Sequence, residues 1–167
     1  MYSSGMAIIE LNITDEQVDR VNAQYPFYNL KNSITKGKSQ VYGSLGEIVV
    51  IDHFWRLGVK AESTYDYDLT IADRTVDVKT KRTTVKPRGN YLCGIPASST
   101  HQKCDYYFFV RILEDMTKAF LLGYYSRKKY FEDATFKKKG EVDVNGFVFK
   151  DDCYNLEIAK LKSFTVR

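Results

Sequence analysis

The chain has 167 residues, of which 44% are hydrophobic and 28% charged, which suits a folded globular domain and excludes disordered and low-complexity classes. Its length predicts one domain with a sizeable buried core. No apolar run reaches the ~18 residues that a membrane helix needs, and the N-terminus lacks the pattern of a secretion signal. The three cysteines, an odd and widely spaced set, indicate reduced thiols and a cytoplasmic protein.

The net charge of +4 is unevenly distributed along the chain. Six basic residues and no acid lie between Val78 and Cys104, and six basic residues with two acids lie between 127 and 139. Acids gather instead near the N-terminus and just before the first basic stretch, at Asp66, Asp68 and Asp73. Solvated surface charge would explain this pattern, but a basic surface beside an acidic cluster also suits a polyanion held next to a metal ion.

In chain order, the first predicted elements are helices. The capping-box pattern of Thr14 and Gln17 predicts a helix over 14–25, followed by a polar loop over 26–39. Apolar residues at helical spacing predict a second helix over 40–57, ending at Gly58. Glu47 lies on a mostly apolar stripe of this helix, where a carboxylate must be paired, bind a metal or lie at the edge of a cleft.

Strands dominate the middle of the chain. Alternating and apolar runs predict four of them, at 67–71, 75–80, 105–113 and 118–124. The third is largely apolar and should therefore be central. A short helix over 126–131 follows, and 147–149 and 156–158 are expected to be edge strands. Together these elements predict an α/β fold with a central mixed sheet of four or five strands flanked by helices.

The first two strands are expected to form a hairpin whose geometry has chemical consequences. With Ala72 and Asp73 as turn residues, Asp68 lies directly opposite Asp77. Asp77 and Lys79 share one face of their strand, while the intervening valines point into the core. Two opposed carboxylates repel at a cost of roughly 0.2–1 kcal/mol, which a divalent cation between them removes, and such oxygen ligands suit Mg²⁺ or Mn²⁺. The alternative is a Lys–Asp pair on a solvated strand face, worth about 0–1 kcal/mol.

Lys79 beside such a metal could orient and help deprotonate a water molecule, and could stabilise charge on a phosphate oxygen. Glu47, from the helix that packs across the sheet, could supply a third acidic ligand, or it could form a buried ion pair with a lysine or arginine. A zinc site built from Cys93, His101 and Cys104 is not favoured, because their spacing is poor for zinc.

The order of these residues resembles that of the PD-(D/E)xK nuclease superfamily, and in particular its small phage-type members. The matching residues are Gly46-Glu47 on a helix, Asp68 on the first strand and Asp77-Val78-Lys79 on the next. The resemblance covers roughly residues 40–139, with Tyr67 in place of the proline that often precedes the first strand acid. It implies a restriction-endonuclease-like fold and Mg²⁺- or Mn²⁺-dependent hydrolysis of phosphodiester bonds in DNA, including branched or otherwise structured duplex.

The resemblance also implies roles for individual residues. Asp68, Asp77 and Glu47 would bind the metal, and Lys79 would activate the water, so that these four form the catalytic set. The residues expected to contact the nucleic-acid backbone are Lys36, Lys38, Lys81, Arg82, Lys86 and Arg88. A single domain would fill residues 1–167, with an N-terminal helix and basic loop (1–39), a nuclease core (40–139) and C-terminal strands (140–167).

Two other functions fit parts of the sequence. The same fold could belong to a nucleic-acid-binding accessory or regulatory protein that does not cut, although such a protein would not need the acidic cluster. A protein-interaction role without nucleic acid is the second alternative. Symmetric cleavage of both strands would require a homodimer, no membrane partner is expected, and a phage-encoded enzyme would work in the host cytoplasm.

Overall fold

The computed structural model describes residues 7–24, 38–64, 69–100 and 103–164. The helices in these ranges are α1 (Asp15–Gln24), α2 (Lys38–Arg56) and α3 (Arg127–Asp133), with the short 3-10 turns η1 (Ala97–Ser99) and η2 (Ile158–Lys160). The strands are β1 (Ile9–Asn12), β2 (Ala61–Ser63), β3 (Leu69–Ile71), β4 (Arg74–Thr83), β5 (Leu92–Pro96), β6 (Tyr106–Leu113), β7 (Lys118–Ser126), β8 (Thr135–Lys137) and β9 (Cys153–Glu157). None of the helices in these ranges combines the length and the apolar character that crossing a membrane requires.

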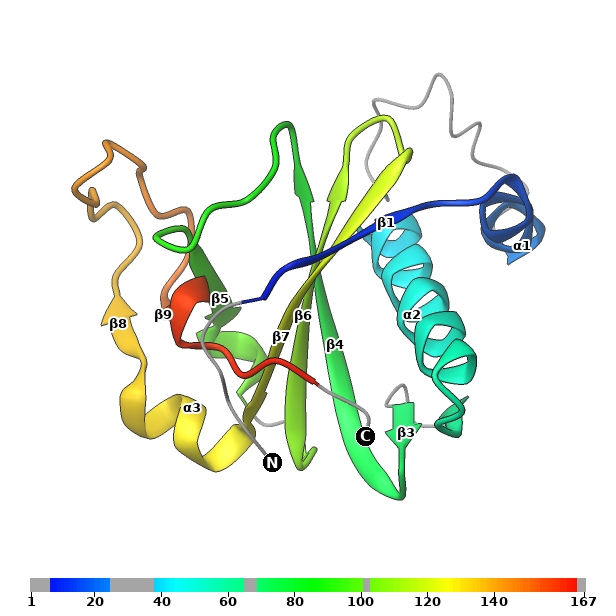
Figure 1. The fold of residues 1–167 in the computed structure, drawn as a ribbon. Helices are drawn as coiled ribbons and strands as arrows, with labels where there is room; N and C mark the ends of the chain where they lie inside the picture. The colour runs from blue at the N-terminus through cyan, green and yellow to red at the C-terminus, as the bar shows by residue number, and fades with distance from the viewer. Residues whose placement is uncertain (1–6, 25–37, 65–68, 101–102, 165–167) are drawn as a thin grey trace.

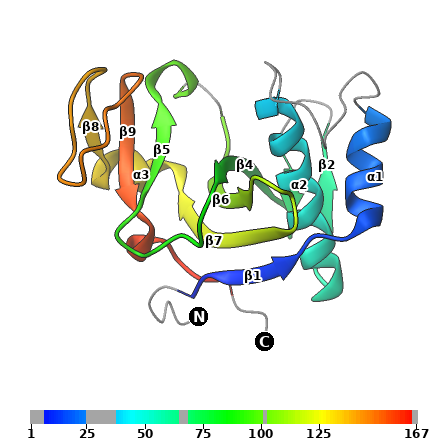
Figure 2. The same cartoon turned by 90° about the horizontal axis from the view of Figure 1, so that it is seen from above.

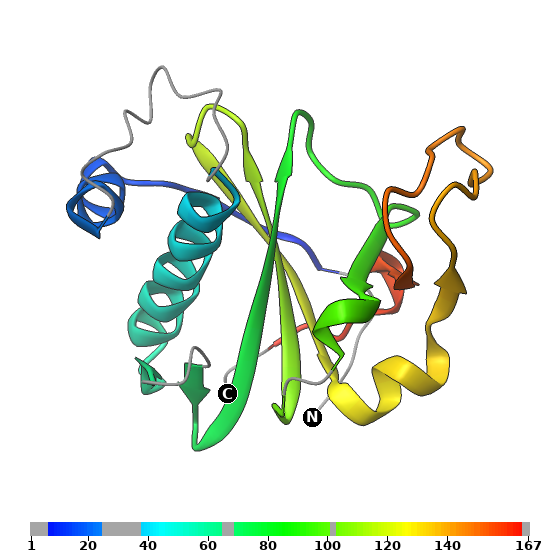
Figure 3. The ribbon, with the colours of Figure 1, turned by 180° about the vertical axis from the view of Figure 1, so that it is seen from behind.

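The strands form two separate sheets. Six strands make a mixed sheet in the order β1-β7-β6-β4-β3-β2, and β5, β9 and β8 make a smaller antiparallel sheet. In the large sheet β4 and β6 are parallel, whereas the other neighbouring pairs are antiparallel. Helices α1 and α2 lie on one side of the large sheet, and the small sheet with α3 lies on the other (Figure 1, Figure 2); Figure 3 shows this division from behind. The predicted mixed α/β class is confirmed.

Each face of the large sheet has its own hydrophobic core. Under α2, the buried residues Leu45 and Phe54 pack with Phe108 of β6. On the opposite face, Tyr107 packs with Tyr130 of α3. Neighbouring residues of β6 therefore serve opposite cores, as the alternation of side chains along a strand requires, and β6 is the buried central strand that the sequence predicts.

The helices lie close to their predicted positions. α2 begins at Lys38 rather than at residue 40, and the remainder of the predicted loop over 26–39 lies outside the described residues. Gly58 ends α2 with a left-handed φ of 76°. The amides of Gly58 and Val59 then donate to the carbonyls of Trp55 and Phe54 at 3.0 and 2.9 Å, which is the hydrogen-bond pattern of a Schellman motif.

The hairpin between β3 and β4 has the predicted register. Leu69 lies opposite Val76, and the two turn residues Ala72 and Asp73 have φ angles of 48° and 64°. Positive φ at both central positions is typical of a type I′ turn, whose twist matches that of the flanking strands. The turn therefore sets which side chains of β4 share a face.

Gly46 allows α2 to lie against β4. A Cβ atom at this position would be 2.0 Å from Oγ1 of Thr80 and 3.0 Å from its Cβ, which is too close for real atoms. Because the threonine side chain is short and branched at Cβ, it cannot turn away as a long side chain would. Glycine is therefore needed for this approach of helix to strand.

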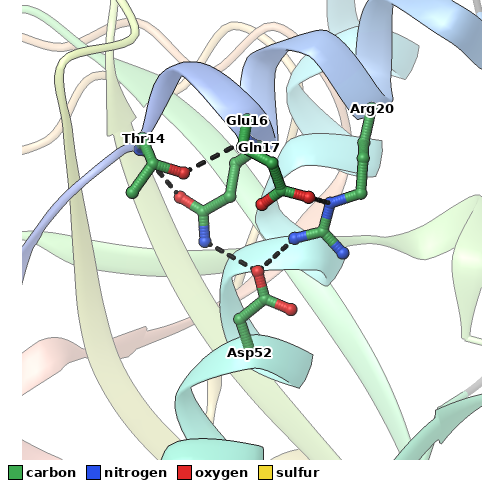
Figure 4. A network of polar contacts seen from close by, with 5 residues as sticks. All are labelled: Thr14, Glu16, Gln17, Arg20 and Asp52. Carbon is green, nitrogen blue, oxygen red and sulfur yellow. Dashed lines mark hydrogen bonds and ion pairs between the residues drawn. The ribbon is translucent and has the colours of Figure 1, made fainter.

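A polar network joins α1 to α2 (Figure 4). Thr14 and Gln17 form the predicted capping box, with amide-to-side-chain hydrogen bonds of 3.0 and 3.1 Å. The buried side chain of Gln17 also donates from Nε2 to Oδ2 of Asp52 at 2.9 Å. Arg20 forms one ion pair with Asp52 and another, of 3.0 Å, with Glu16. A single carboxylate on α2 thus accepts from two side chains of α1.

The structure corrects the predicted sheet in three respects. The large sheet has six strands, not four or five, because β1 and β2 lie at its two edges. Residues 156–157 belong to β9, the middle strand of the second sheet, and are not an edge strand. Residues 147–149 form no strand, and Val148 makes only an isolated bridge to Val142. The short runs of β5 and β9, LCGIP and CYNLE, lack the alternation that marks a strand, so pairing with distant segments decides their conformation.

Replacing Gly46 by alanine should destabilise the fold. The new methyl group gains about 1 kcal/mol of helix propensity but overlaps Thr80, so we expect the free energy of unfolding to fall by about 1–3 kcal/mol. Gly43→Ala is the matched control on the same helix, because no atom lies within 4 Å of its Cβ position, and it should stabilise. Urea denaturation measures both variants. Thr80→Ala should recover part of the loss, and equal stability of the two alanine variants would contradict the close contact.

Asp52→Ala should also destabilise the protein, by about 1–3 kcal/mol, because the buried amide of Gln17 loses its acceptor. Asp19→Ala removes an exposed carboxylate from α1, and its effect should stay within about 0.5 kcal/mol. The same denaturation experiment compares them. A loss that is no larger for Asp52 than for Asp19 would show that the network does not hold α1 in place.

Candidate active site

Asp77 and Lys79 form an ion pair on β4. The ammonium of Lys79 lies 2.8 Å from Oδ2 of Asp77, and the two side chains are 21% and 11% exposed, respectively. Val76 and Val78 alternate with them and contribute to the core under α2. The acid and the lysine therefore share the other face of the strand, the one that faces away from the helix.

Tyr107 of β6 lies beside this pair. It is the partner of Asp77 in the parallel register of β4 and β6, and the Lys79 ammonium lies 5.9 Å from the centre of its ring. Burial raises the pKa of Tyr107 to about 12, with the negative charge of Asp77 adding to the shift and the guanidinium of Arg127 opposing it. The phenol therefore stays protonated at neutral pH and cannot serve as a base there.

A cleft of about 680 Å³ opens next to Lys79, between the two sheets. One wall is formed by β4, β6 and β7, and the other by β5, β9 and the segment that joins β8 to β9. Asp77 lies at the margin: it is paired with Lys79, which lines the cleft, but is not itself among the lining residues. The ion pair thus marks the place where the cleft meets the large sheet.

Four cations line the cleft, together with the two carboxylates Asp143 and Asp151. Lys81 and Arg111 are partners in the register of β4 and β6 and both line it, as does Lys150. Arg111 is only 8% exposed; it donates to the carbonyl of Leu92 at 2.9 Å, and its guanidinium lies 5.4 Å from the ring centre of Tyr91. In the part of the chain that the structure describes, no carboxylate forms an ion pair with Lys81 or Arg111.

This unneutralised charge affects the titration of the two groups. Burial, followed by the positive charge of Arg111, lowers the pKa of Lys81, and burial lowers the pKa of Arg111. The cost is largest for Arg111, which is buried, whereas the Lys81 side chain is exposed; an anion in the cleft would relieve it.

Glu47 and Asp68 were predicted to complete an acidic cluster with Asp77. Glu47 is half-buried on α2, directly after Gly46, whose contact with Thr80 brings this turn of the helix against β4. Glu47 is not among the residues that line the cleft. It belongs to α2, which packs on the face of β4 opposite to that of Asp77, so the structure does not bring the two carboxylates together. Asp68 lies outside the described residues; the register from which its position opposite Asp77 was predicted holds for the rest of the hairpin.

The carboxylate of Asp77 is a ligand of the type that Mg²⁺ prefers, and Mg²⁺ is commonly held by one or two carboxylates together with water and substrate phosphates. Within the described ranges, no three His, Cys, Asp or Glu side chains gather to hold a metal. The Asp77 carboxylate therefore fits such an ion as one of its protein ligands.

Two predicted nucleic-acid contacts, Lys81 and Arg82, lie on opposite faces of β4. Lys81 lines the cleft, whereas the guanidinium of Arg82 lies 5.7 Å from the ring centre of Tyr42 on α2. Adjacent residues of a strand must point in opposite directions. The two cations therefore cannot contact the same stretch of backbone in the cleft.

The remaining predicted contacts do not gather in the cleft either. Lys86 pairs with Glu10 of β1 at 3.8 Å, and Arg88 is exposed. Lys38 is the first residue of α2, and Lys36 lies outside the described residues.

Sequence reasoning missed Arg111 and Lys150. Arg111 did carry a signal, because it is a charged residue within the apolar run YYFFVRIL, and a buried charge calls for a partner or a function. The reasoning that singled out Glu47 would have found it. Lys150 carries no such signal, since it reaches the cleft from an irregular segment far along the chain.

All three cysteines are free, as expected. Cys93 lines the cleft, but burial raises its pKa to about 12, so its thiol is a poor nucleophile at neutral pH. His101, which belongs to the disfavoured zinc combination, lies outside the described residues.

No protein-family model, no curated protein and no solved structure matches this chain. The resemblance to the PD-(D/E)xK superfamily therefore depends on the motif residues alone, and a function has to be argued from the geometry around Asp77, Lys79 and the cleft.

Proposed function

We propose that this protein is a Mg²⁺-dependent nuclease that hydrolyses phosphodiester bonds in DNA, with branched or otherwise structured DNA as its substrate. The observation that carries the proposal is the Asp77–Lys79 pair at the margin of a cleft lined by unneutralised cations. Cations attract the phosphate backbone without regard to sequence. A DNA backbone held by Lys81 and Arg111 would pass beside the Asp77–Lys79 pair at the cleft margin.

The chemistry that Mg²⁺ supplies when bound is a water molecule of lowered pKa and neutralisation of charge on the phosphate. Asp77 would hold the ion through its carboxylate, with Asp68 proposed as a further ligand. Glu47 belongs to the helix that covers the opposite face of β4 and is not assigned to this ion. Lys79 can donate a hydrogen bond that orients the attacking water, and its charge can stabilise a non-bridging phosphate oxygen as negative charge develops there. Lys81 and Arg111 would hold neighbouring phosphates and fix the position of the strand.

A nucleic-acid-binding protein that does not cut is the second candidate. It is favoured by Lys81 and Arg111, which line the cleft, because cations suffice for binding whereas cleavage also needs a metal site. The two candidates differ in their dependence on Asp77, which cleavage requires and backbone binding does not.

Asp77→Asn should reduce cleavage by at least about 100-fold while DNA binding persists. Supercoiled plasmid incubated with Mg²⁺ or Mn²⁺ reports cutting through its nicked and linear forms, and EDTA should abolish cutting by the wild type. Asp73→Asn makes the same chemical change in the exposed turn of the same hairpin, where asparagine tolerates positive φ, and should retain the wild-type rate. A wild-type chain that binds DNA at low salt but leaves plasmid intact with either ion would favour the binding protein.

Arg111→Met should weaken DNA binding equally for all sequences and reduce the slope of log Kobs against log salt concentration by about 1. Fluorescence anisotropy in EDTA, repeated at several salt concentrations, measures the slope. Arg56→Met makes the same charge change at an exposed position on the last turn of α2, and should leave the slope unchanged. Equal slopes for the wild type and Arg111→Met would mean that DNA does not enter the cleft.

A further inference from the structure

The segment that joins β8 to β9, residues 138–152, presents apolar side chains to solvent, and we call it the arm. Val144 is 100% exposed and Phe147 46% exposed, and Val142 and Val148 are exposed as well. Single exposed apolar residues are ordinary on a protein surface, but several in one short segment form a patch of the kind that marks an interaction site.

Hydrogen bonds within the arm hold it in shape. The amide of Phe149 donates to the carbonyl of Glu141 at 2.9 Å. The Asp143 carboxylate accepts from the amides of Asn145 and Phe147 at 2.8 and 2.9 Å. Phe147 is therefore positioned by its backbone although its side chain is not buried, so binding to it would cost little ordering.

Phe147 lines the cleft. Its ring centre lies 5.5 Å from the ammonium of Lys81 and 5.2 Å from the ring centre of Phe149, which is buried and meets it edge to face. The arm thus brings a half-exposed aromatic ring next to a cation that shares a strand face with Lys79.

The charges identify the occupant of this surface. Three of the four acids of the arm are engaged: Asp143 and Asp152 accept from backbone amides, and Glu141 pairs with Lys137 at 3.9 Å. The fourth, Asp151, lines the cleft but forms no ion pair with Lys81 or Arg111 in the described chain. The cations Lys81 and Arg111 have no carboxylate partner among the described residues. An apolar protein surface would leave those charges unpaired, whereas a nucleic acid supplies phosphates for them and a base for the ring.

The base that contacts Phe147 must be unpaired. In a duplex, each base is covered on both faces by its neighbours, whereas unpaired bases can be splayed out and stacked on aromatic side chains. The cleft, at about 680 Å³, is of the size that holds a drug-sized molecule, which matches one or two nucleotides rather than a duplex.

We propose that Phe147 stacks on an unpaired base of a nucleic acid whose backbone lies along Lys81 and Arg111, so that the protein selects single-stranded or locally unpaired DNA. This inference deepens the proposed function and depends on it only in taking the cleft as the nucleic-acid site. It does not require that the DNA be cut.

Binding in EDTA tests the stacking without cleavage. A short single strand containing 2-aminopurine, and the same sequence as a duplex, are titrated with the full chain, and affinity is followed by anisotropy and stacking by quenching of the base fluorescence. Phe147→Ala should lower the affinity for the single strand by about 5- to 150-fold and abolish the quenching, with less than about a twofold effect on the duplex. Phe136→Ala is the matched control, since Phe136 is 44% exposed, does not line the cleft and lies on β8.

Two further variants separate stacking from folding. Phe147→Leu keeps an apolar contact with Phe149 but has no aromatic face, and should lose affinity as the alanine variant does; Phe147→Trp should retain it. Thermal melting checks that each variant is folded. If Phe147→Ala does not fold, the affinity of Phe147→Leu for the single strand tests the stacking instead.

Three results would overturn the proposal: unchanged single-strand affinity in Phe147→Leu, an equal loss for single strand and duplex, or an equal loss in Phe136→Ala. If Phe147→Ala had a lower molecular mass than the wild type in light scattering but bound DNA equally well, the proposal would also be overturned. The arm would then be a contact between copies of the chain. A chain that binds and quenches as expected but never cuts would refute only the nuclease, and a chain that cuts with unchanged binding in the Phe147 variants would refute only the stacking.

Discussion

The alternation of side chains along β4 is the constraint on which both the fold and the candidate site depend. Val76 and Val78 are directed to the core under α2, and Asp77, Lys79 and Lys81 are directed to the opposite face. A slip of one residue would bury the charges under the helix and present the valines to the cleft. The type I′ turn after β3 and the close packing of α2 both oppose such a slip. The packing that stabilises the sheet therefore also positions the polar side chains.

The candidate site contains a charged residue, Arg111, at a position where burial makes the charge energetically unfavourable. Arg111 is 8% exposed and has one carbonyl as its hydrogen-bond acceptor, and the Lys81 ammonium lies beside it without an acidic partner in the described chain. Buried charge of this kind lowers stability, and natural proteins tolerate it where function requires it. Two separate hydrophobic cores, one on each face of the large sheet, offset that cost. A cleft that served stability alone would have an apolar residue in place of the buried Arg111; the Lys81 side chain is exposed.

The cleft is assembled from segments that are far apart in the chain. Lys81 comes from β4, Arg111 from β6 and Phe147 from the arm between β8 and β9. The small sheet holds the arm on the face of the large sheet that α2 leaves uncovered. Because β6 is central and β9 is paired on both sides, these residues are attached to rigid elements. Because these elements are rigid, the exposed ring of Phe147 and the buried cation Arg111 both line the cleft.

Local patterns in the sequence were sufficient for the elements whose interactions are local. The capping box of α1, the helical spacing of α2 and the turn at Ala72 and Asp73 each involve residues a few positions apart, so the hairpin register and the shared face of Asp77 and Lys79 could be predicted. Alternation alone also separates Lys81 from Arg82, although charge counting had grouped them. Of the predicted acidic cluster, Asp68 lies outside the described residues, whereas Glu47 and Asp77 belong to elements on opposite faces of β4.

Contacts between distant segments decided the rest. β5 and β9 have no strand pattern of their own and become strands because they pair with each other. The cleft between the sheets and the entry of Lys150 and Phe147 into it follow from that pairing. A sequence read locally determines which face of an element a residue lies on. Only the packing of the elements determines which residues of other elements that residue contacts. The free energy of packing comes from surfaces that meet only in the folded chain.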